Sequence, residues 1–302
     1  MALFKLKLAA ATGTLALIAS SAIAAPITLE SDFVRVSITD KGVFNSLRYD
    51  STGTGTFAAN KDYVSPGVPF EGFGVKVGTG AVQANSNSGG TAIAGSLAAA
   101  SGSFNYGALW TGGNTQYSLS HLFYFNNGDE RVNIRTTLTA LSDLGNIRFS
   151  RAVDPDPDNY SGGSASTNNQ RGIAAQGIPV EDFVGSLGSI SGLPLGLFYS
   201  GLIVHNTGIV DNCCSTIDPD AYLSGGDRGN SSSGDDGIGL AFNLGNLSRG
   251  QALTWDYAYV MGGSLDSIDI PGGSTVPEPT SLALLGLSLG TLGLMRRRRK
   301  SA

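Results

Sequence analysis

The sequence has few of the residues that most often form bridges, bind metals or carry catalysis, with only two cysteines and two histidines among 302 residues. The cysteines, Cys213 and Cys214, are neighbours, so their Cα atoms lie about 3.8 Å apart across a trans peptide, short of the usual ~4.4–6.8 Å of a disulfide. An ordinary disulfide within the chain is therefore excluded. Three states of the cysteine pair stay open: a strained vicinal disulfide, a disulfide bridge to another molecule, or two reduced thiols. The two disulfide states are favoured in an oxidising compartment, that is, outside the cytoplasm.

The common catalytic signatures are also missing. Neither histidine begins an H-E-x-x-H zinc motif, no serine stands in G-x-S-x-G, and no glycine-rich loop ends in Gly-Lys-Ser/Thr. His121 and His205 each lie in an apolar segment, where an imidazole with satisfied hydrogen bonds is more common than a ligand or a base. The usual zinc, nucleophile and phosphate-binding sites are therefore not expected.

The N-terminus has the three regions of a secretory signal peptide. Lys5 and Lys7 precede an apolar run over residues 8–18, and Ala22 and Ala24 form an A-x-A exit. We expect a signal helix over residues 1–24, cleaved after Ala24 by signal peptidase. A buried N-terminal helix is the alternative, and it explains the order of the three regions less well.

The C-terminus carries a second short apolar segment, over residues 281–295, which would span only about 22 Å as a helix, against about 30 Å for a bilayer core. A helix this short needs long cationic side chains that reach the lipid headgroups. A cluster of five cationic residues directly after the apolar segment supplies such side chains. An ordinary single-pass anchor is therefore the weaker interpretation. The cluster comprises Arg296, Arg297, Arg298, Arg299 and Lys300.

Together, Pro277, Glu278, Pro279, the apolar helix and the terminal arginines resemble the PEP-CTERM sorting signal of Gram-negative bacteria. The resemblance covers residues 277–300, after a flexible spacer over 271–276. It implies a transient inner-membrane intermediate, recognition by an exosortase, and delivery to the cell surface or an exopolysaccharide matrix. More loosely, residues 151–169 and 253–262 resemble stretches of other exported, β-rich PEP-CTERM proteins of unassigned activity.

The remaining body is acidic. Once Lys5, Lys7, the five C-terminal cations and Glu278 are set aside, 23 acidic and 12 basic residues remain over 26–276, a net charge of −11. Such a surface repels nucleic acid and attracts divalent cations. We therefore expect no nucleic-acid partner.

The body, residues 25–270, is predicted to be all-β: a large antiparallel sandwich of two sheets between the N-terminal signal helix and the C-terminal hydrophobic helix. The 43 Gly and 11 Pro of the whole chain stay below the roughly 25–30% that indicates disorder, and no Gly-X-Y period suggests collagen. Period-two alternation predicts strands, most clearly over 131–141. One short helix is expected near 180–187. Residues 154–172 and 212–237 are predicted to be long loops. Other predicted strands cover 27–38, 43–49, 73–77, 117–125, 195–204, 238–244 and 253–261.

The first of these loops carries a candidate calcium site. Asp154, Asp156, Asp158 and Asn159 place four oxygen-bearing side chains within six residues, and calcium takes six to eight oxygen ligands. The pattern is not an EF-hand, because Asn159 stands at the sixth position in place of Gly and Ala165 at the twelfth in place of Glu. A solvated acidic turn stiffened by proline is the other interpretation, and the more common one.

A second acidic group lies on the other predicted loop. If it folds near the first, a carboxylate pair for glycosidic chemistry becomes conceivable, but the sequence does not supply the separation that such a pair needs. Exposed aromatic rings of Tyr106, Trp110 and Tyr160 would suit sugar stacking, although such rings more often lie in a core. The second group comprises Asp218, Asp220, Asp227, Asp235 and Asp236.

Three functions follow as expectations. The first is a non-enzymatic, surface- or matrix-delivered sandwich with a structural, adhesive or glycan-associated role, whose partner is an extracellular polysaccharide. The second is a secreted carbohydrate-active enzyme that uses loop carboxylates. The third is a calcium-dependent binding module, with calcium as the one cofactor considered. The sequence assigns no catalytic residue.

Overall fold

The computed structural model describes residues 25–67, 70–160, 163–211 and 217–271. The signal segment 1–24, Cys213 and Cys214, and the sorting segment 277–300 lie outside the described residues, and so does most of the spacer. Among the residues that are described, no helix is long and apolar enough to cross a membrane.

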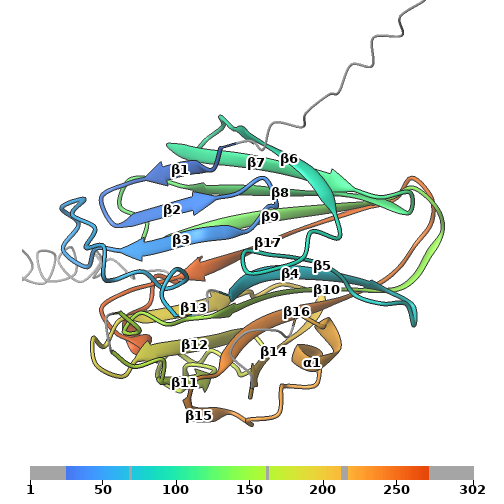
Figure 1. Cartoon of the computed structure of the whole chain (residues 1–302). Helices are drawn as coiled ribbons and strands as arrows, with labels where there is room; N and C mark the ends of the chain where they lie inside the picture. Colours follow the sequence, from blue (N-terminus) through green and yellow to red (C-terminus); the bar gives the residue numbers. More distant parts are fainter. Residues whose placement is uncertain (1–24, 68–69, 161–162, 212–216, 272–302) are drawn as a thin grey trace, which may run out of the picture.

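Strands make up most of the described chain, and the named strands pair antiparallel, which confirms the predicted all-β class. They form three hydrogen-bonded sheets in place of the two expected (Figure 1). Sheet A, the smallest, has the order β1-β2-β3, with β1 at Ile27–Glu30, β2 at Val34–Ile38 and β3 at Phe44–Tyr49.

Sheet B has five strands in the order β14-β16-β10-β4-β5. Its two longest strands, β16 and β10, are neighbours in the sheet but lie far apart in the sequence. The members are β14 (Val204–Val210), β16 (Gly237–Leu247), β10 (Leu144–Asp154), β4 (Phe70–Val77) and β5 (Gln83–Ser86).

Sheet C has nine strands in the order β15-β11-β12-β13-β17-β9-β8-β7-β6. Strand β17, the last strand among the described residues, lies in the middle and joins β13 on one side to β9 on the other. The members are β15 (Ser231–Gly234), β11 (Thr167–Arg171), β12 (Phe183–Gly188), β13 (Pro194–Phe198), β17 (Ala252–Val260), β9 (Arg131–Ala140), β8 (Tyr117–Phe125), β7 (Tyr106–Gly113) and β6 (Ala94–Ala99).

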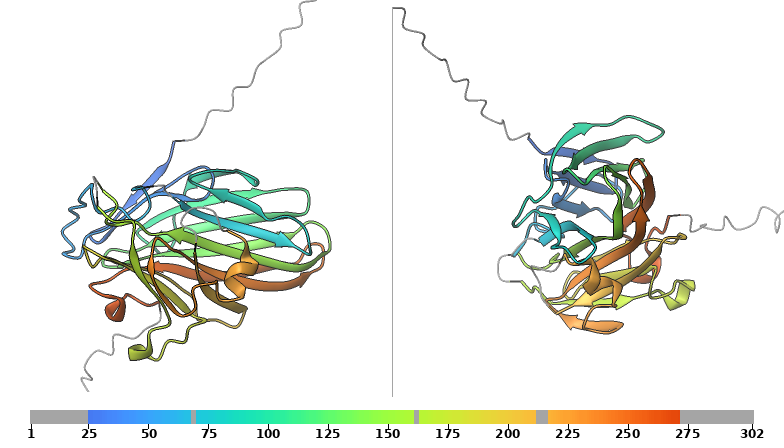
Figure 2. Two further views of the ribbon diagram at one scale, coloured as in Figure 1. Left: turned by 60° about the horizontal axis from the view of Figure 1, so that its bottom comes forward. Right: turned by 90° about the vertical axis from the view of Figure 1, so that its right-hand side faces the viewer.

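Sheets A and B both face sheet C, so the molecule is a two-layered sandwich with one layer split (Figures 1 and 2). From sheet A, Phe44 packs on Phe123 with ring centroids 5.5 Å apart. From sheet B, Phe73 packs on Trp110 at 5.4 Å. One continuous apolar core therefore runs from Leu29 to Met261, and burying such aromatic rings contributes much of the stability of a sandwich.

Sheet B is covered on its other face as well. Helix α1 (Pro219–Leu223) packs there and buries Tyr222 beside Ala152 and Ala241. The close approach depends on Gly239, where an added Cβ would stand 2.3 Å from the Tyr222 ring. Strand β10 is consequently buried on both faces along its second half. Two 3-10 turns, η1 (Ala174–Gln176) and η2 (Leu265–Ser267), complete the described elements.

Three local predictions were wrong. The helix expected near 180–187 is strand β12, whose outer face packs against the end of the body at Leu265 and Ile268. The single strand expected over 195–204 is two, β13 and β14, which belong to different sheets. The long loops contain regular structure: β11 in the first, and α1 and β15 in the second.

Candidate functional site

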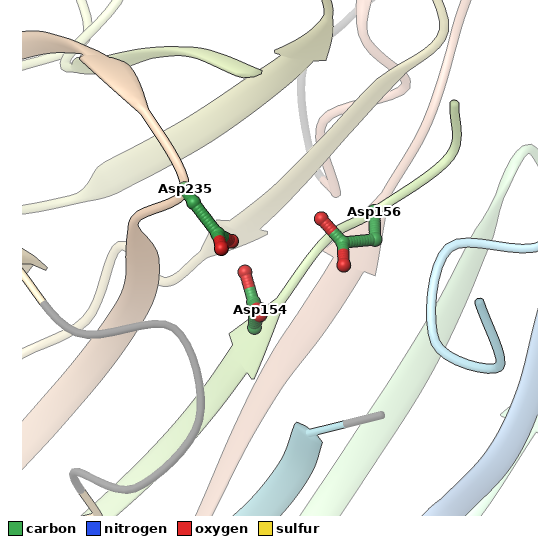
Figure 3. Close-up of side chains that lie close together, drawn as sticks. All are labelled: Asp154, Asp156 and Asp235. Carbon is green, nitrogen blue, oxygen red and sulfur yellow. The ribbon is translucent and has the colours of Figure 1, made fainter. Parts of the chain in front are cut away.

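Three carboxylates meet where strand β10 ends and β16 begins. These strands are antiparallel neighbours with Val153 opposite Ile238, so the residues just after β10 lie beside those just before β16. Asp154, Asp156 and Asp235 each place an oxygen there, and the three oxygens lie within 4.8 Å of one another. Figure 3 shows the side chains pointing toward a common centre from two separate segments. We call this group the acidic cluster.

The segment after β10 is held in place from several sides. The backbone N–H of Asp156 donates to the carbonyl of Tyr63 at 3.0 Å. The Asn159 side-chain amide donates to Asp156 Oδ2, also at 3.0 Å. Gly67 has a positive φ of 69° and passes so close that an added Cβ would stand 2.6 Å from Asp156 Oδ2. The Asp156 carboxylate is thus fixed by neighbours that leave it no room to turn away.

Burial makes this cluster electrostatically costly. Asp154 and Asp156 are each only 3% exposed, whereas Asp235 is exposed and opens the cluster to solvent. Loss of hydration raises the pKa of Asp154 to about 9, and the charges of Asp156 and Asp235 add to the shift. Desolvation likewise raises the pKa of Asp156 to about 6. The pKa of Asp235 is also raised, by desolvation and by Asp236. All three shifts disfavour the ionised form.

A buried oxygen in the cluster lacks a partner. Asp156 Oδ1 accepts no hydrogen bond from any described residue. A buried polar atom of this kind costs roughly 1–3 kcal/mol unless something binds to it. The adjacent Asp236 is similar: one of its oxygens accepts from Arg228 Nε at 3.0 Å, and its other oxygen, Oδ2, is buried without a partner among the described residues.

The arrangement suits a hard cation. A divalent ion among three converging carboxylates would relieve their repulsion and occupy the unpartnered oxygen of Asp156, while water on the Asp235 side could complete the six to eight oxygens that calcium takes. Carboxylate oxygens are also the ligands of Mg²⁺ and Mn²⁺, but those ions demand stricter octahedral geometry.

The cation site predicted from the sequence is rearranged in the structure. Asp154 and Asp156 are in the cluster, and Asn159 supports it through Asp156. Asp158 is not part of the cluster. Its carboxylate accepts hydrogen bonds from the backbone N–H groups of Ile190 at 2.8 Å and of Ser191 at 3.1 Å. Asp235, from the second acidic group, takes the place that the sequence pattern gave to Asp158.

The rest of that second group disperses over the surface. Asp218 and Asp220 bind Lys76 at 3.0 and 2.7 Å, and Asp220 also pairs with Arg148. Asp227 accepts from the backbone of Asp211 at 2.7 Å. These carboxylates hold α1 and its following loop, and they do not converge with Asp154.

Both histidines are tied into the fold. His121 is fully buried, its ring stacked on Trp110 at 5.2 Å and its Nδ1 bonded to Thr136 at 2.8 Å. Burial lowers its pKa well below the ordinary value, so it is neutral. His205 contacts Asp182 through Nε2 at 2.9 Å and the carbonyl of Ile203 through Nδ1 at 2.6 Å.

The three aromatic candidates for sugar stacking differ in exposure. Trp110 is fully buried in the main core. Tyr106 is half-buried and packs on Phe125 with ring centroids 5.3 Å apart. Tyr160 is 39% exposed. Only this last ring, four residues after Asp156, is presented to solvent.

A family model described as the PEP-CTERM protein-sorting motif matches residues 275–300. The chain therefore carries this sorting motif, which begins two residues before the segment predicted from the sequence. The motif implies export, a membrane-anchored sorting intermediate and processing by an exosortase-type enzyme. No curated protein matches the chain.

Among solved structures, a bacterial glucoamylase complexed with acarbose is similar over 82% of this chain, with 12% identity and a TM-score of 0.53. The chain spans only 33% of that protein, and the likeness shows a shared fold alone. A putative aldose 1-epimerase from Escherichia coli K12 aligns with 78% of this chain and 97% of its own, at 12% identity and a TM-score of 0.36. A polysaccharide lyase aligns with 82% and 34%, at 13% identity and a TM-score of 0.33.

Proposed function

We propose that the exported body is a non-enzymatic, cation-dependent β-sandwich that works at the cell surface or in the exopolysaccharide matrix. One observation carries the cation dependence: carboxylates from two segments some 80 residues apart converge to within 4.8 Å, and two of them are buried. Ionised together without a cation, they would repel one another and destabilise the join between β10 and β16.

A bound calcium ion would act as a clamp in this protein. It would tie the end of β10 to the start of β16 and fix the turn that follows Asp156. Calcium is abundant outside the cell, and the export that the sorting motif implies would expose the body to it. The acidic body favours the approach of such an ion.

Stability measurements test the proposal. At a calcium concentration about a hundredfold above Kd, the wild type should gain about 2.7 kcal/mol over the protein in EDTA. Asp235→Asn removes one ligand from the exposed side and should lose most of this gain. Asp32→Asn, an exposed acid outside the cluster, is the matched control and should respond as the wild type does. Equal responses in all three proteins, or none, would refute the cation site.

A secreted carbohydrate-active enzyme is the second candidate. It is favoured by Asp154, whose pKa of about 9 would keep it protonated as a general acid near the Asp156 carboxylate. The third carboxylate favours chelation: a glycosidase uses a pair of carboxyl groups that flank the bond they cleave, whereas oxygens of three aspartates converge here to within 4.8 Å. Release of reducing sugar from polysaccharide by the wild type, abolished in Asp154→Asn, would establish the enzyme instead.

A further inference from the structure

A surface notch of about 300 Å³ is lined in part by Pro157, Asp158 and Tyr160, which follow Asp156 of the acidic cluster along the chain. Its wall includes the ring of Tyr160, the apolar side chains of Pro157 and Ile190, and the polar side chains of Asn60 and Lys61. Its volume is at the lower end of the roughly 300–1,000 Å³ of small-molecule sites. It therefore suits a single ring of a longer chain better than an engulfed ligand.

The notch presents apolar surface that the fold leaves uncovered. Tyr160 is 39% exposed and Ile190 is 72% exposed. Among the described residues, no other aromatic ring packs on Tyr160. A tyrosine ring held open to water beside an aliphatic side chain offers a flat apolar platform.

Polar groups stand around this platform with their hydrogen-bonding capacity unused. The side chains of Asn60 and Lys61 are exposed, and neither has a hydrogen-bond partner among the described residues. Lys61 is also one of few cations in an acidic body. An amide supplies both donors and an acceptor, and an ammonium supplies three donors.

From these features we infer that the notch binds one pyranose ring of an extracellular polysaccharide, stacked on Tyr160, with its hydroxyl or carboxylate groups bonded to Asn60 and Lys61. A sugar ring matches the platform because its C–H face is apolar while its edge is lined with hydroxyls. Neutral hexose and hexuronic acid share this chemistry. They differ at Lys61, whose charge would favour the acid.

Two segments that line the notch are tied to each other by hydrogen bonds. Asp158 accepts hydrogen bonds from the backbone N–H groups of Ile190 and Ser191, which joins the turn to the loop after β12. The turn is closed on itself by Ser164 N–H donating to the Asp158 carbonyl at 3.1 Å. A platform fixed before binding costs little conformational entropy when the sugar arrives.

The same turn connects the notch to the acidic cluster. Asn159, the residue before Tyr160, donates to the Asp156 carboxylate through its side chain and to the Asp156 carbonyl through its backbone, at 3.0 and 3.1 Å. A cation bound at Asp156 would fix Asn159 and, through it, the ring of Tyr160. Sugar binding should therefore be stronger with calcium, and this coupling rests on the proposed cation site.

Isothermal titration of the purified protein with maltohexaose and with hexagalacturonate tests the inference, each in calcium and in EDTA. At least one sugar should bind in calcium. Tyr160→Ala should weaken binding about tenfold or more, equivalent to ~1.4 kcal/mol, whereas Tyr160→Phe keeps the ring and should bind as the wild type does. Lys61→Gln should weaken hexagalacturonate more than maltohexaose. Leu202→Ala, which truncates an exposed side chain outside the notch, is the control.

Binding of neither sugar, or wild-type binding by Tyr160→Ala, would overturn the sugar site. Equal affinity in calcium and in EDTA would overturn the coupling. The cation site is judged separately, because calcium should raise the melting temperature of Tyr160→Ala as much as that of the wild type. Loss of that rise in both proteins would refute the proposed function while leaving the sugar result to stand.

Discussion

Arg151 and Glu71 form an ion pair in which both side chains are completely buried between the sheets. The Arg151 guanidinium lies 5.1 Å from the ring centre of Phe44 and 5.5 Å from that of Phe123, so aromatic faces surround the cation. Glu71 also accepts from the Tyr259 hydroxyl at 2.8 Å. The pair joins strands β4 and β10 of sheet B to both other sheets.

Removing one partner of this pair should be strongly destabilising. Arg151→Met leaves the Glu71 carboxylate buried without its cation and should lower the free energy of unfolding by about 3–5 kcal/mol. The double variant Arg151→Met/Glu71→Gln should lose less than Arg151→Met alone, because no charge is left unpaired. Urea denaturation measures both. Arg135→Met is the control, since its pair with Asp256 is about half exposed and should cost at most about 1 kcal/mol.

The acidic cluster predicts an unusual dependence of stability on pH. The pKa values of about 9 for Asp154 and about 6 for Asp156 lie above the ordinary value of aspartate, near 4. Between the unfolded pKa, near 4, and the folded pKa of Asp154, about 9, the folded protein therefore binds more protons than the unfolded chain. Its stability should fall as pH rises from about 5 to about 9. Calcium, by pairing with the ionised carboxylates, should reduce this fall.

Melting temperatures measured in EDTA and in calcium across this range check the prediction. The calcium effect should be larger at pH 8 than at pH 5, and Asp235→Asn should flatten the EDTA curve. Stability in EDTA that rises steadily with pH would contradict the assignment of raised pKa values to the cluster.

The absence of a side chain at Gly67 should be required for calcium binding, because Gly67 lies against the Asp156 carboxylate. Gly67→Ala places a Cβ 2.6 Å from Asp156 Oδ2 at a positive φ of 69°, so it should lower stability by about 1–2 kcal/mol and also weaken calcium binding. Gly55→Ala is the matched control, because Gly55 has a φ of 71° with nothing within 4 Å. It should show the loss of stability without the loss of affinity. Calcium titrations that give both variants the wild-type affinity would argue against the role of Gly67.

The sorting motif predicts where a defective precursor collects. Replacement of Pro277, Glu278 and Pro279 by alanine leaves the apolar segment and its arginines in place but removes the motif's signature residues. The protein should then stay in the membrane fraction at its precursor size. Cell fractionation and immunoblotting would detect this, and normal release of the variant would count against exosortase processing.

The strand predicted most closely from the sequence has one face exposed to solvent. Residues 131–141 alternate cleanly, and β9 occupies Arg131–Ala140. Strands β4 and β16, which are buried on both faces over much of their length, were predicted from apolar runs over 73–77 and 238–244. Strand β10 was not predicted, because α1 covers its outer face and its second half is buried on both sides, which removes the alternation. The apolar run Phe183–Val184 was assigned to a helix for a related reason, since η2 covers the outer face of β12. The periodicity of a strand's own residues does not reveal which of its faces will be covered by segments distant in the sequence.

The candidate site was predicted in its chemistry but only partly in its membership. Asp154 and Asp156 were found because they are close in sequence, and Asp235 was noted as an acid on another loop whose position was open. Its place in the cluster depends on the register between β10 and β16, which pairs Val153 with Ile238. No local sequence pattern determines the register between two strands some 80 residues apart. The position of Asp235 just before the apolar strand β16 was the one local signal that it lies at a strand end.

The position of β17 governs when the body can mature. Its residues 252–260 lie between β13 and β9, and within the part of the chain that the structure describes no other strand unites the two halves of sheet C. Until that late segment is available to pair, the halves have no common partner and the core between the layers stays incomplete. This order suits a polypeptide that crosses a membrane before it folds, because β17, the strand that joins the two halves of sheet C, follows both of its neighbours, β9 and β13, in the sequence.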